Sequence, residues 1–218
     1  MPSSRALPCL ALLLACVAPA PAGAQRAFPL TEVRSYLSAT APLAGAWKAQ
    51  VHLYEYASPA RRALDEVKAG VGAEYARGPW KALLAWEHVA AVSDGAHFAE
   101  ERFSVEATAA RRLAAWLSAA DLQKIEARDM ARGWASRWTN RLRADLGEAE
   151  LPAVAPWVAH QWSYDARYRE VNKSAWLYGV RLRGRRPVGV ELYLYDETDV
   201  ARTPRRMTAA CVAVSVRS

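Results

Sequence analysis

One histidine and one glutamate form the pair in this sequence best suited to moving a proton. His88 lies in WKALLAWEHVAAV (residues 80–92), Glu101 lies in HFAEERFSVE (residues 97–106), and the Asp94-Gly95 step between them is typical of a type I′ hairpin turn. If Asp94 and Gly95 form that turn, Ser93 faces Ala96 and His88 lies directly opposite Glu101. A carboxylate beside an imidazole can hold the ring in one tautomer, as the orienting partner of a general base does in an enzyme. The pair is therefore a candidate ligand-binding or catalytic site.

Four tyrosines form a second candidate site. Tyr54, Tyr56, Tyr193 and Tyr195 alternate with apolar residues in segments that read as strands, so they fall on the mixed faces of those strands. A concave sheet lined by such side chains could bind a small apolar, sugar-like or anionic ligand. We therefore count the four tyrosines as candidate ligand-binding residues together with His88 and Glu101.

The common catalytic and metal-binding motifs are absent from the sequence. It contains no HExxH, CxxC, GxSxG, P-loop or dinucleotide-binding glycine pattern, and its four histidines do not recur at helical spacings. No catalytic residue, metal or cofactor is assigned. The sequence favours an exported, non-enzymatic ligand-binding or envelope-associated protein. The alternative is a hydrolase or isomerase whose site surrounds His88 and Glu101.

The first residues resemble an export signal. Arg5 precedes a short apolar run (residues 7–18), and small residues at 22–24 suit signal-peptidase cleavage, which predicts a signal peptide over 1–24 and a single domain over 25–218. The expected location is secreted or periplasmic. LLAC (residues 13–16) also suits a lipobox, which would anchor the chain to a membrane through Cys16. No apolar run is long enough to predict a transmembrane helix.

The charge and the cysteine content say little about the partners of the protein. The chain has 29 Lys and Arg residues against 22 Asp and Glu residues, a formal net charge of +7 that favours anionic partners in a general way. No nucleic-acid partner is expected for an exported protein. Cys211 lies in an alternating apolar segment, so we expect it to be a small buried residue rather than a reactive thiol. The oligomeric state is left open.

Four helices are predicted in the first two thirds of the chain. Residues 30–42 and 58–70 suit short helices, the second with Ser58 as N-cap, Pro59 at the first position and Gly70 as the stop. Residues 108–117 suit another helix, and 118–146 suit a long helix that ends at Gly147. The buried stripe of this long helix would consist of residues that recur every four positions: Met130, Trp134, Trp138 and Leu142.

From His160 onward the sequence alternates as strands do. A three-residue loop at Asn172–Ser174, which is also an N-glycosylation sequon, would place Tyr168 opposite Tyr178. A loop at Gly184–Arg186 would place Val180 opposite Val190 and Leu182 opposite Val188. The arginines of VRLRGRRPVGVEL (residues 180–192) would then decorate a solvated hairpin tip, with docking of an anionic partner as the alternative.

These elements predict an α+β fold. A curved antiparallel sheet of six to seven strands, ending in a four-strand meander, would be packed by one long helix and several shorter ones. PLAGAWKAQ (residues 42–50) resembles the Gly-x-Trp opening strand of lipocalin-like proteins over nine residues. That resemblance implies the alternative fold, a lipocalin-like β-barrel with inserted helices.

Overall fold

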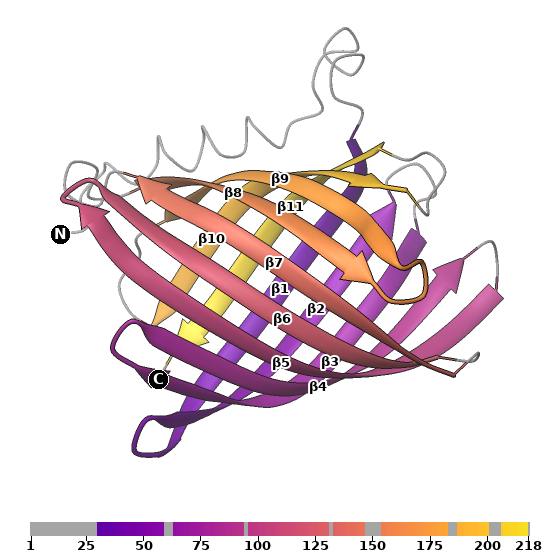
Figure 1. The fold of residues 1–218 in the computed structure, drawn as a ribbon, viewed down its shortest axis with the longest axis horizontal. Coiled ribbons are helices and arrows are strands. Elements are labelled where there is room, and N and C mark those ends of the chain that lie inside the picture. Colours follow the sequence, from indigo (N-terminus) through magenta and orange to yellow (C-terminus); the bar gives the residue numbers. More distant parts are fainter. Residues whose placement is uncertain are drawn as a thin grey trace, which may run out of the picture. The chain divides into compact units, whose positions relative to one another are not determined.

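The described part of the chain consists of β-strands joined by turns. The computed structural model describes residues 30–58, 63–93, 96–130, 133–146, 154–182, 187–200 and 206–217. Eleven strands lie in these ranges (Figure 1): β1 (Leu30–Ala44), β2 (Trp47–Ser58), β3 (Ala63–Arg77), β4 (Trp80–Ser93), β5 (Ala96–Ala114), β6 (Leu117–Met130), β7 (Gly133–Leu146), β8 (Val154–Asp165), β9 (Glu170–Leu182), β10 (Val188–Asp199) and β11 (Arg206–Arg217). No helix in the described ranges is long and apolar enough to cross a membrane.

The strands of residues 31–218 close into one barrel. Each strand pairs antiparallel with the next one along the chain, and β1 completes the barrel against β11. Because the number of strands is odd, β1 and β11 run in the same direction where they meet. At this seam the Thr31 hydroxyl donates to the Thr208 carbonyl at 3.0 Å and accepts from the Thr208 amide at 3.1 Å. A single side chain thus satisfies both backbone groups of Thr208.

Glycines allow two of the tight turns between strands. Gly45, between β1 and β2, and Gly78, between β3 and β4, both have a φ of 59°. This left-handed conformation is open to glycine at little cost and unfavourable for most other residues. These two positions therefore fix where the first and second pairs of strands reverse direction.

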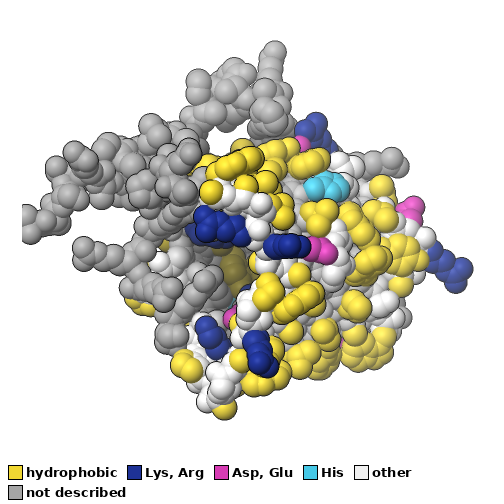
Figure 2. All heavy atoms as spheres, turned by 60° about the vertical axis from the view of Figure 1, so that its left-hand side comes forward, with side chains coloured by type: hydrophobic (Ala, Val, Ile, Leu, Met, Phe, Trp, Pro, Cys, Tyr) yellow, Lys and Arg dark blue, Asp and Glu magenta, His cyan; other side chains and the backbone are white. Residues whose placement is uncertain are grey.

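The two faces of the barrel wall have opposite polarity. In β4, Ala85, Glu87 and Val89 are buried in the interior, whereas Leu84 and Trp86 on the outer face are half exposed. The same alternation carries most charged side chains inward and most large apolar side chains outward along the other strands. Figure 2 shows one outer face of the barrel, on which hydrophobic side chains predominate. A water-soluble barrel has the reverse arrangement.

Aromatic side chains gather on the outer face near one end of the barrel. Trp47 and Tyr75 lie beside each other at the ends of β2 and β3, with ring centroids 5.2 Å apart. Trp80, at the start of β4, and Trp116, in the turn between β5 and β6, are both more than half exposed. Tryptophan and tyrosine at such positions are typical of the boundary between a membrane and water.

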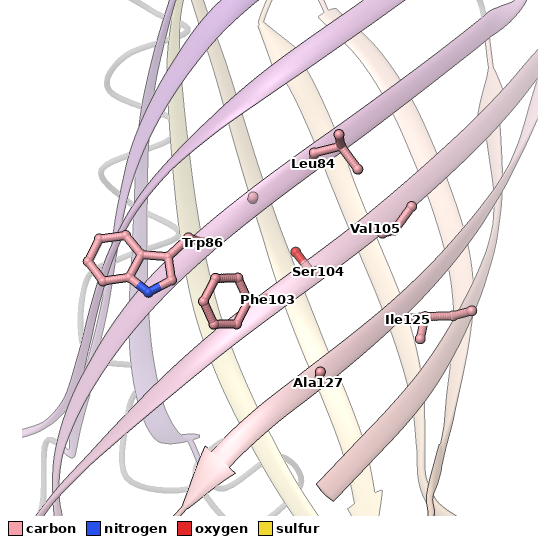
Figure 3. Close-up of a pocket in the computed structure, with 8 residues that line it drawn as sticks. Leu84, Trp86, Phe103, Ser104, Val105, Ile125 and Ala127 are labelled. Atoms are coloured by element: carbon pink, nitrogen blue, oxygen red, sulfur yellow. The ribbon is translucent and has the colours of Figure 1, made fainter. Parts of the chain in front are cut away.

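A shallow apolar hollow lies on the outer surface of β4, β5 and β6. It has a volume of about 470 Å³, and Trp86, Phe103, Val105 and Ile125 contribute large side chains to it. Figure 3 shows these side chains along three neighbouring strands, with Trp86 and Phe103 next to each other. Among its lining residues, polar atoms come only from the Ser104 hydroxyl, the Trp86 indole and the backbone.

The predicted α+β fold is wrong, because the described residues contain no helix. The described residues of the four predicted helical segments lie in strands or in a turn: residues 30–42 belong to β1, residues 63–70 to β3, residues 108–117 to β5, the turn after it and β6, and residues 118–130 and 133–146 to β6 and β7. The four-residue spacing misled the prediction because an even spacing also keeps residues on one face of a strand. Trp134, Trp138 and Leu142 do share a face, but it is the outer face of β7, where all three are exposed.

The lipocalin-like alternative with inserted helices is also wrong. Gly45 lies in the turn between β1 and β2, so the Gly-x-Trp pattern spans a turn rather than opening the first strand. The wall consists of eleven strands, each antiparallel to the next along the chain. The described ranges contain no inserted helix.

The predicted registers are correct in one hairpin and wrong in two. The β4–β5 register is confirmed, because Leu84 pairs with Val105, Trp86 with Phe103 and His88 with Glu101. The β9–β10 register is wrong by two residues: Leu182 pairs with Val190 and Val180 with Leu192, so the parity is right and the loop longer than expected.

The β8–β9 hairpin turns at residues 166–169, so Asn172–Ser174 lies within β9 and is not a loop. Three predictions fall outside the described residues: the signal peptide and Cys16 anchor, the Asp94-Gly95 turn, and the arginines of residues 183–186.

Candidate functional site: the barrel interior

The interior of the barrel is lined by buried polar and charged side chains. Those that are almost fully buried come from most of the strands and include both signs of charge: Gln50, His52, Glu87, Glu100, Arg102, Ser104, Glu126, Arg128, Thr139, Asp145, Ser163, Asp165, Glu197 and Asp199. Buried charges are costly unless they are paired and hydrogen-bonded. The contacts among these groups therefore decide what the interior can do.

One cluster links four neighbouring strands through arginines. Glu100 of β5 accepts hydrogen bonds from Arg102 Nε at 2.8 Å and from Arg128 Nη2 at 2.8 Å, and a second bond joins it to Arg128 Nε. Arg128 of β6 also lies 3.6 Å from Asp165 of β8, whose carboxylate accepts from Arg137 of β7 at 3.0 Å. The cluster therefore ties β5, β6, β7 and β8 together on the inner wall.

The turn after β8 extends this cluster. Arg167, in the turn at residues 166–169, donates from Nε to Asp165 Oδ1 at 2.9 Å. This side-chain hydrogen bond raises the pKa of the Arg167 guanidinium above its usual value, so the group stays protonated at any physiological pH. Asp165 thus anchors a turn as well as the wall.

A second cluster connects strands that are not neighbours. Arg143 of β7 donates from both terminal nitrogens to the Glu191 carboxylate of β10, each at 3.0 Å, although β8 and β9 lie between these strands. The Arg143 guanidinium also lies 4.0 Å above the Trp157 ring. Gly179 of β9 makes room for Trp157, because a Cβ there would lie 2.6 Å from the indole ring. The Arg143–Glu191 ion pair therefore links β7 to β10 across the inner surface.

A histidine and a glutamate form a third bridge across a strand. His52 Nε2 of β2 lies 2.9 Å from Glu87 Oε1 of β4, and both side chains are about 95% buried. The strand between them, β3, carries Gly70 at this point. A Cβ on Gly70 would lie 2.4 Å from His52 Nε2 and 2.8 Å from the Trp86 carbonyl oxygen. The glycine is what permits the two side chains to meet.

Replacement of Gly70 by alanine is therefore expected to destabilise the barrel by about 1–3 kcal/mol, the usual cost of forcing extra atoms into a packed site. The measurement is the free energy of unfolding in urea. Gly189→Ala is the matched control, since its Cβ would meet the movable Ser215 hydroxyl at 2.9 Å rather than backbone. Equal stability of the two variants would contradict the steric role of Gly70.

The four predicted tyrosines all face the interior, and an arginine joins two of them. Arg34 of β1 lies over the Tyr56 ring at 4.7 Å and over the Tyr195 ring at 4.4 Å. Tyr195 donates to Glu197 at 2.6 Å, and Tyr193 packs against Trp157 with ring centroids 5.3 Å apart. Tyr54 lies beside Tyr36, with ring centroids 4.2 Å apart.

His88 and Glu101 lie on the opposite side of the wall from the tyrosines. His88 Nδ1 is 2.6 Å from Glu101 Oε1, so the predicted pair exists, but the side chains are on the outer face with exposed fractions of 47% and 38%. The neighbouring residues 87 and 100 point inward instead. The candidate residues therefore form two separate groups, one outside and one inside the barrel.

Sequence reasoning missed the interior charges. Glu100, Arg102 and Arg128 lie in segments interpreted as a solvent-facing strand or as the polar face of a helix. The spacing of two between Glu100 and Arg102 indicated that both charges lie on one face of a strand, because residues i and i+2 point to the same side. Among the described residues, no group of three or more histidine, cysteine, aspartate or glutamate side chains could hold a metal ion.

One part of the interior is apolar. Trp157, Leu177, Tyr195, Met207 and Cys211 form a buried cluster on the inner faces of β8, β9, β10 and β11, as was expected for Cys211. Cys211 is a free cysteine that is 3% exposed, and its reactivity stays a prediction. The interior thus has an aromatic and apolar side next to its charged clusters.

Comparisons with known proteins give a structural likeness and no sequence relative. No protein-family model matches the chain, and no curated protein matches it. Among solved structures, the chain is similar to an anion-selective porin from Comamonas acidovorans, with 12% sequence identity and a TM-score of 0.44 over 81% of this chain and 54% of the porin. The chain thus spans about half the length of that porin. At this identity and score the likeness carries no argument about function.

Proposed function

We propose that the chain is a membrane-spanning β-barrel of a cell envelope, placed in an outer membrane after export. The reversed polarity of its wall carries this proposal. Val71, Leu142 and Ile125 are more than half exposed on the outer face, whereas Glu100, Glu197 and Asp165 are almost fully buried inside. Strands of a membrane barrel alternate apolar-out and polar-in, and closure leaves no unpaired edge in the lipid.

The interior supports a non-enzymatic role as a narrow polar passage. Barrels of eight strands are just filled by side chains, and barrels of sixteen or more leave a wide aqueous channel. A barrel of eleven strands lies between these limits, so its inward side chains decide what passes. Arg34 and Tyr56, which are partly exposed on the inner wall, would contact a small hydrophilic solute within this passage.

Reconstitution of the full chain into phospholipid vesicles tests both parts of the proposal. We expect a folded form that resists alkaline extraction and migrates differently in electrophoresis before and after boiling, because the barrel is held closed by its hydrogen-bonded wall. Extraction of the protein as a water-soluble species would contradict membrane insertion.

Single-channel recording in a planar bilayer then tests the passage. Discrete conductance steps are expected, and Tyr195→Ala should change their size by widening the interior. An inserted barrel that produces no steps would contradict the passage and leave the insertion standing.

A further inference from the structure

The outer face carries a polar cluster on β6, β7 and β8 at mid-height, where most other strands present apolar side chains. Gln123 and Asn140 lie near the midpoints of β6 and β7, and His160 lies near the midpoint of β8. All three are on the outer face: Gln123 pairs with Asn140, Asn140 lies two residues from the exposed Trp138 on β7, and His160 pairs with the exposed Trp176. At the same level, other strands present apolar side chains: Leu37 of β1, Val71 of β3, Trp86 of β4 and Leu194 of β10.

The cluster is held together by its own hydrogen bonds. Asp121 Oδ1 accepts from Asn140 Nδ2 at 2.7 Å and from Gln123 Nε2 at 3.0 Å, and the Trp138 indole donates to Gln123 Oε1 at 2.9 Å. Within the described residues, the Asp121 carboxylate accepts from amide groups and pairs with no basic side chain. Trp162 packs edge-on against Trp138, with ring centroids 4.6 Å apart.

Lipid is a poor environment for such a surface. The Asp121 carboxylate and the Gln123 amide are partly exposed on this face, whereas Asn140 is almost fully buried beneath its neighbours. In hydrocarbon the two exposed groups would lose their remaining hydrogen bonds to water, so polar groups at this depth normally face protein or a water-filled cavity. The wall itself is continuous here, since β6, β7 and β8 are paired along their lengths. The cluster therefore calls for a protein partner inside the membrane.

We propose that the outer face of β6, β7 and β8 docks a second copy of this chain within the membrane, which rests on the proposed membrane insertion. The chemistry of the surface is self-complementary, because it offers both donors and acceptors. Two copies inserted in the same orientation are related by a two-fold axis along the membrane normal, so groups at equal height face each other. An axis through β7 places Gln123 of one copy against His160 of the second copy, with Asn140 near the axis.

The hydrophobic part of the surface fits the same partner. Trp138 and Leu142 flank Asn140 on the outer face of β7, with exposed fractions of 43% and 56%. Aromatic side chains are enriched in protein interfaces relative to the rest of a protein surface, and Trp138 provides one here.

Crosslinking in vesicles tests the dimer. Leu142→Cys is placed in the full chain with Cys9→Ser, Cys16→Ser and Cys211→Ala, and is treated with a short bismaleimide. We expect a covalent dimer. Leu37→Cys is the matched control, since Leu37 is also exposed at mid-height but lies on β1, on the opposite wall. Trp138→Cys provides a second reporter on β7 in case Leu142→Cys inserts poorly.

Removal of the polar groups separates the dimer from chance collision. Gln123→Leu combined with His160→Leu should lower the crosslinked fraction of Leu142→Cys at least about fivefold, because the hydrogen bonds between copies are lost. Equal crosslinking of the β7 and β1 cysteines, or no crosslinking of either in protein that resists alkaline extraction, would overturn the dimer while membrane insertion stands. Failure of every variant to resist alkaline extraction would instead overturn the proposed function.

Discussion

Val71→Arg is expected to destabilise the barrel in a phospholipid bilayer by about 2–4 kcal/mol, the cost of an arginine near the midplane of a membrane barrel. Val71 lies close to the midpoint of β3, is 52% exposed, and has the apolar Val51 and Trp86 as cross-strand neighbours. In water, an arginine at such an exposed position would cost little. The free energy of unfolding in urea, followed by tryptophan fluorescence in vesicles, gives the value.

Leu43→Arg is the control for this prediction. Leu43 is 61% exposed on the same outer face but lies at the end of β1, beside the β1–β2 turn. Near the membrane boundary an arginine costs about 0–1 kcal/mol, since its long side chain can reach the headgroups. The difference between the two variants therefore measures depth in the lipid. A similar small cost for both would mean that the outer face is not in hydrocarbon.

Glu100→Gln is expected to cost about 3–5 kcal/mol of stability, the typical loss when one member of a buried ion-paired group is removed. The side chain is 2% exposed and joins Arg102 to Arg128. Without its charge, two buried guanidinium groups face each other across β5 and β6. The urea midpoint of the reconstituted protein should fall accordingly.

The neighbouring residue supplies a close control. Glu101→Gln removes the same charge one position along β5, but on the outer face, where the side chain is 38% exposed and contacts His88. Exposed ion pairs contribute about 0–1 kcal/mol, so this variant should be nearly as stable as the native protein. If Glu101→Gln were the more damaging change, the assignment of inner and outer faces of β5 would be reversed.

The strand pairing of one hairpin could be predicted from the sequence, and the fold could not. The β4–β5 register followed from one turn signal and the alternation of Leu84, Trp86, Phe103 and Val105, all within one hairpin. The direction in which that apolar face points depends on the solvent. In water it would face a protein core, and the prediction assumed water. The same assumption turned the charged residues of β6 into the polar face of a helix.

Only part of the candidate site could be predicted from the sequence, for the same reason. The sequence placed four tyrosines on the mixed polar and apolar faces of their strands, and in the barrel all four face the interior: Tyr54, Tyr56, Tyr193 and Tyr195. That Arg34 lies between Tyr56 and Tyr195 could not be foreseen, because it depends on β1 and β11 closing the wall between β2 and β10. Interior bridges such as Arg143 to Glu191 likewise join strands that are far apart in sequence order.

The seam between β1 and β11 also shapes how the chain reaches this structure. Every other strand interface forms between consecutive strands, so those hairpins can assemble through short loops at a small entropic cost. The seam instead brings Thr31 to Thr208 across 177 positions of the chain. We therefore expect the wall to form first as an open, curling sheet, with the joining of its two ends as the slowest step. Until that step, the exposed edges of β1 and β11 can pair with other chains, so aggregation competes with closure during folding.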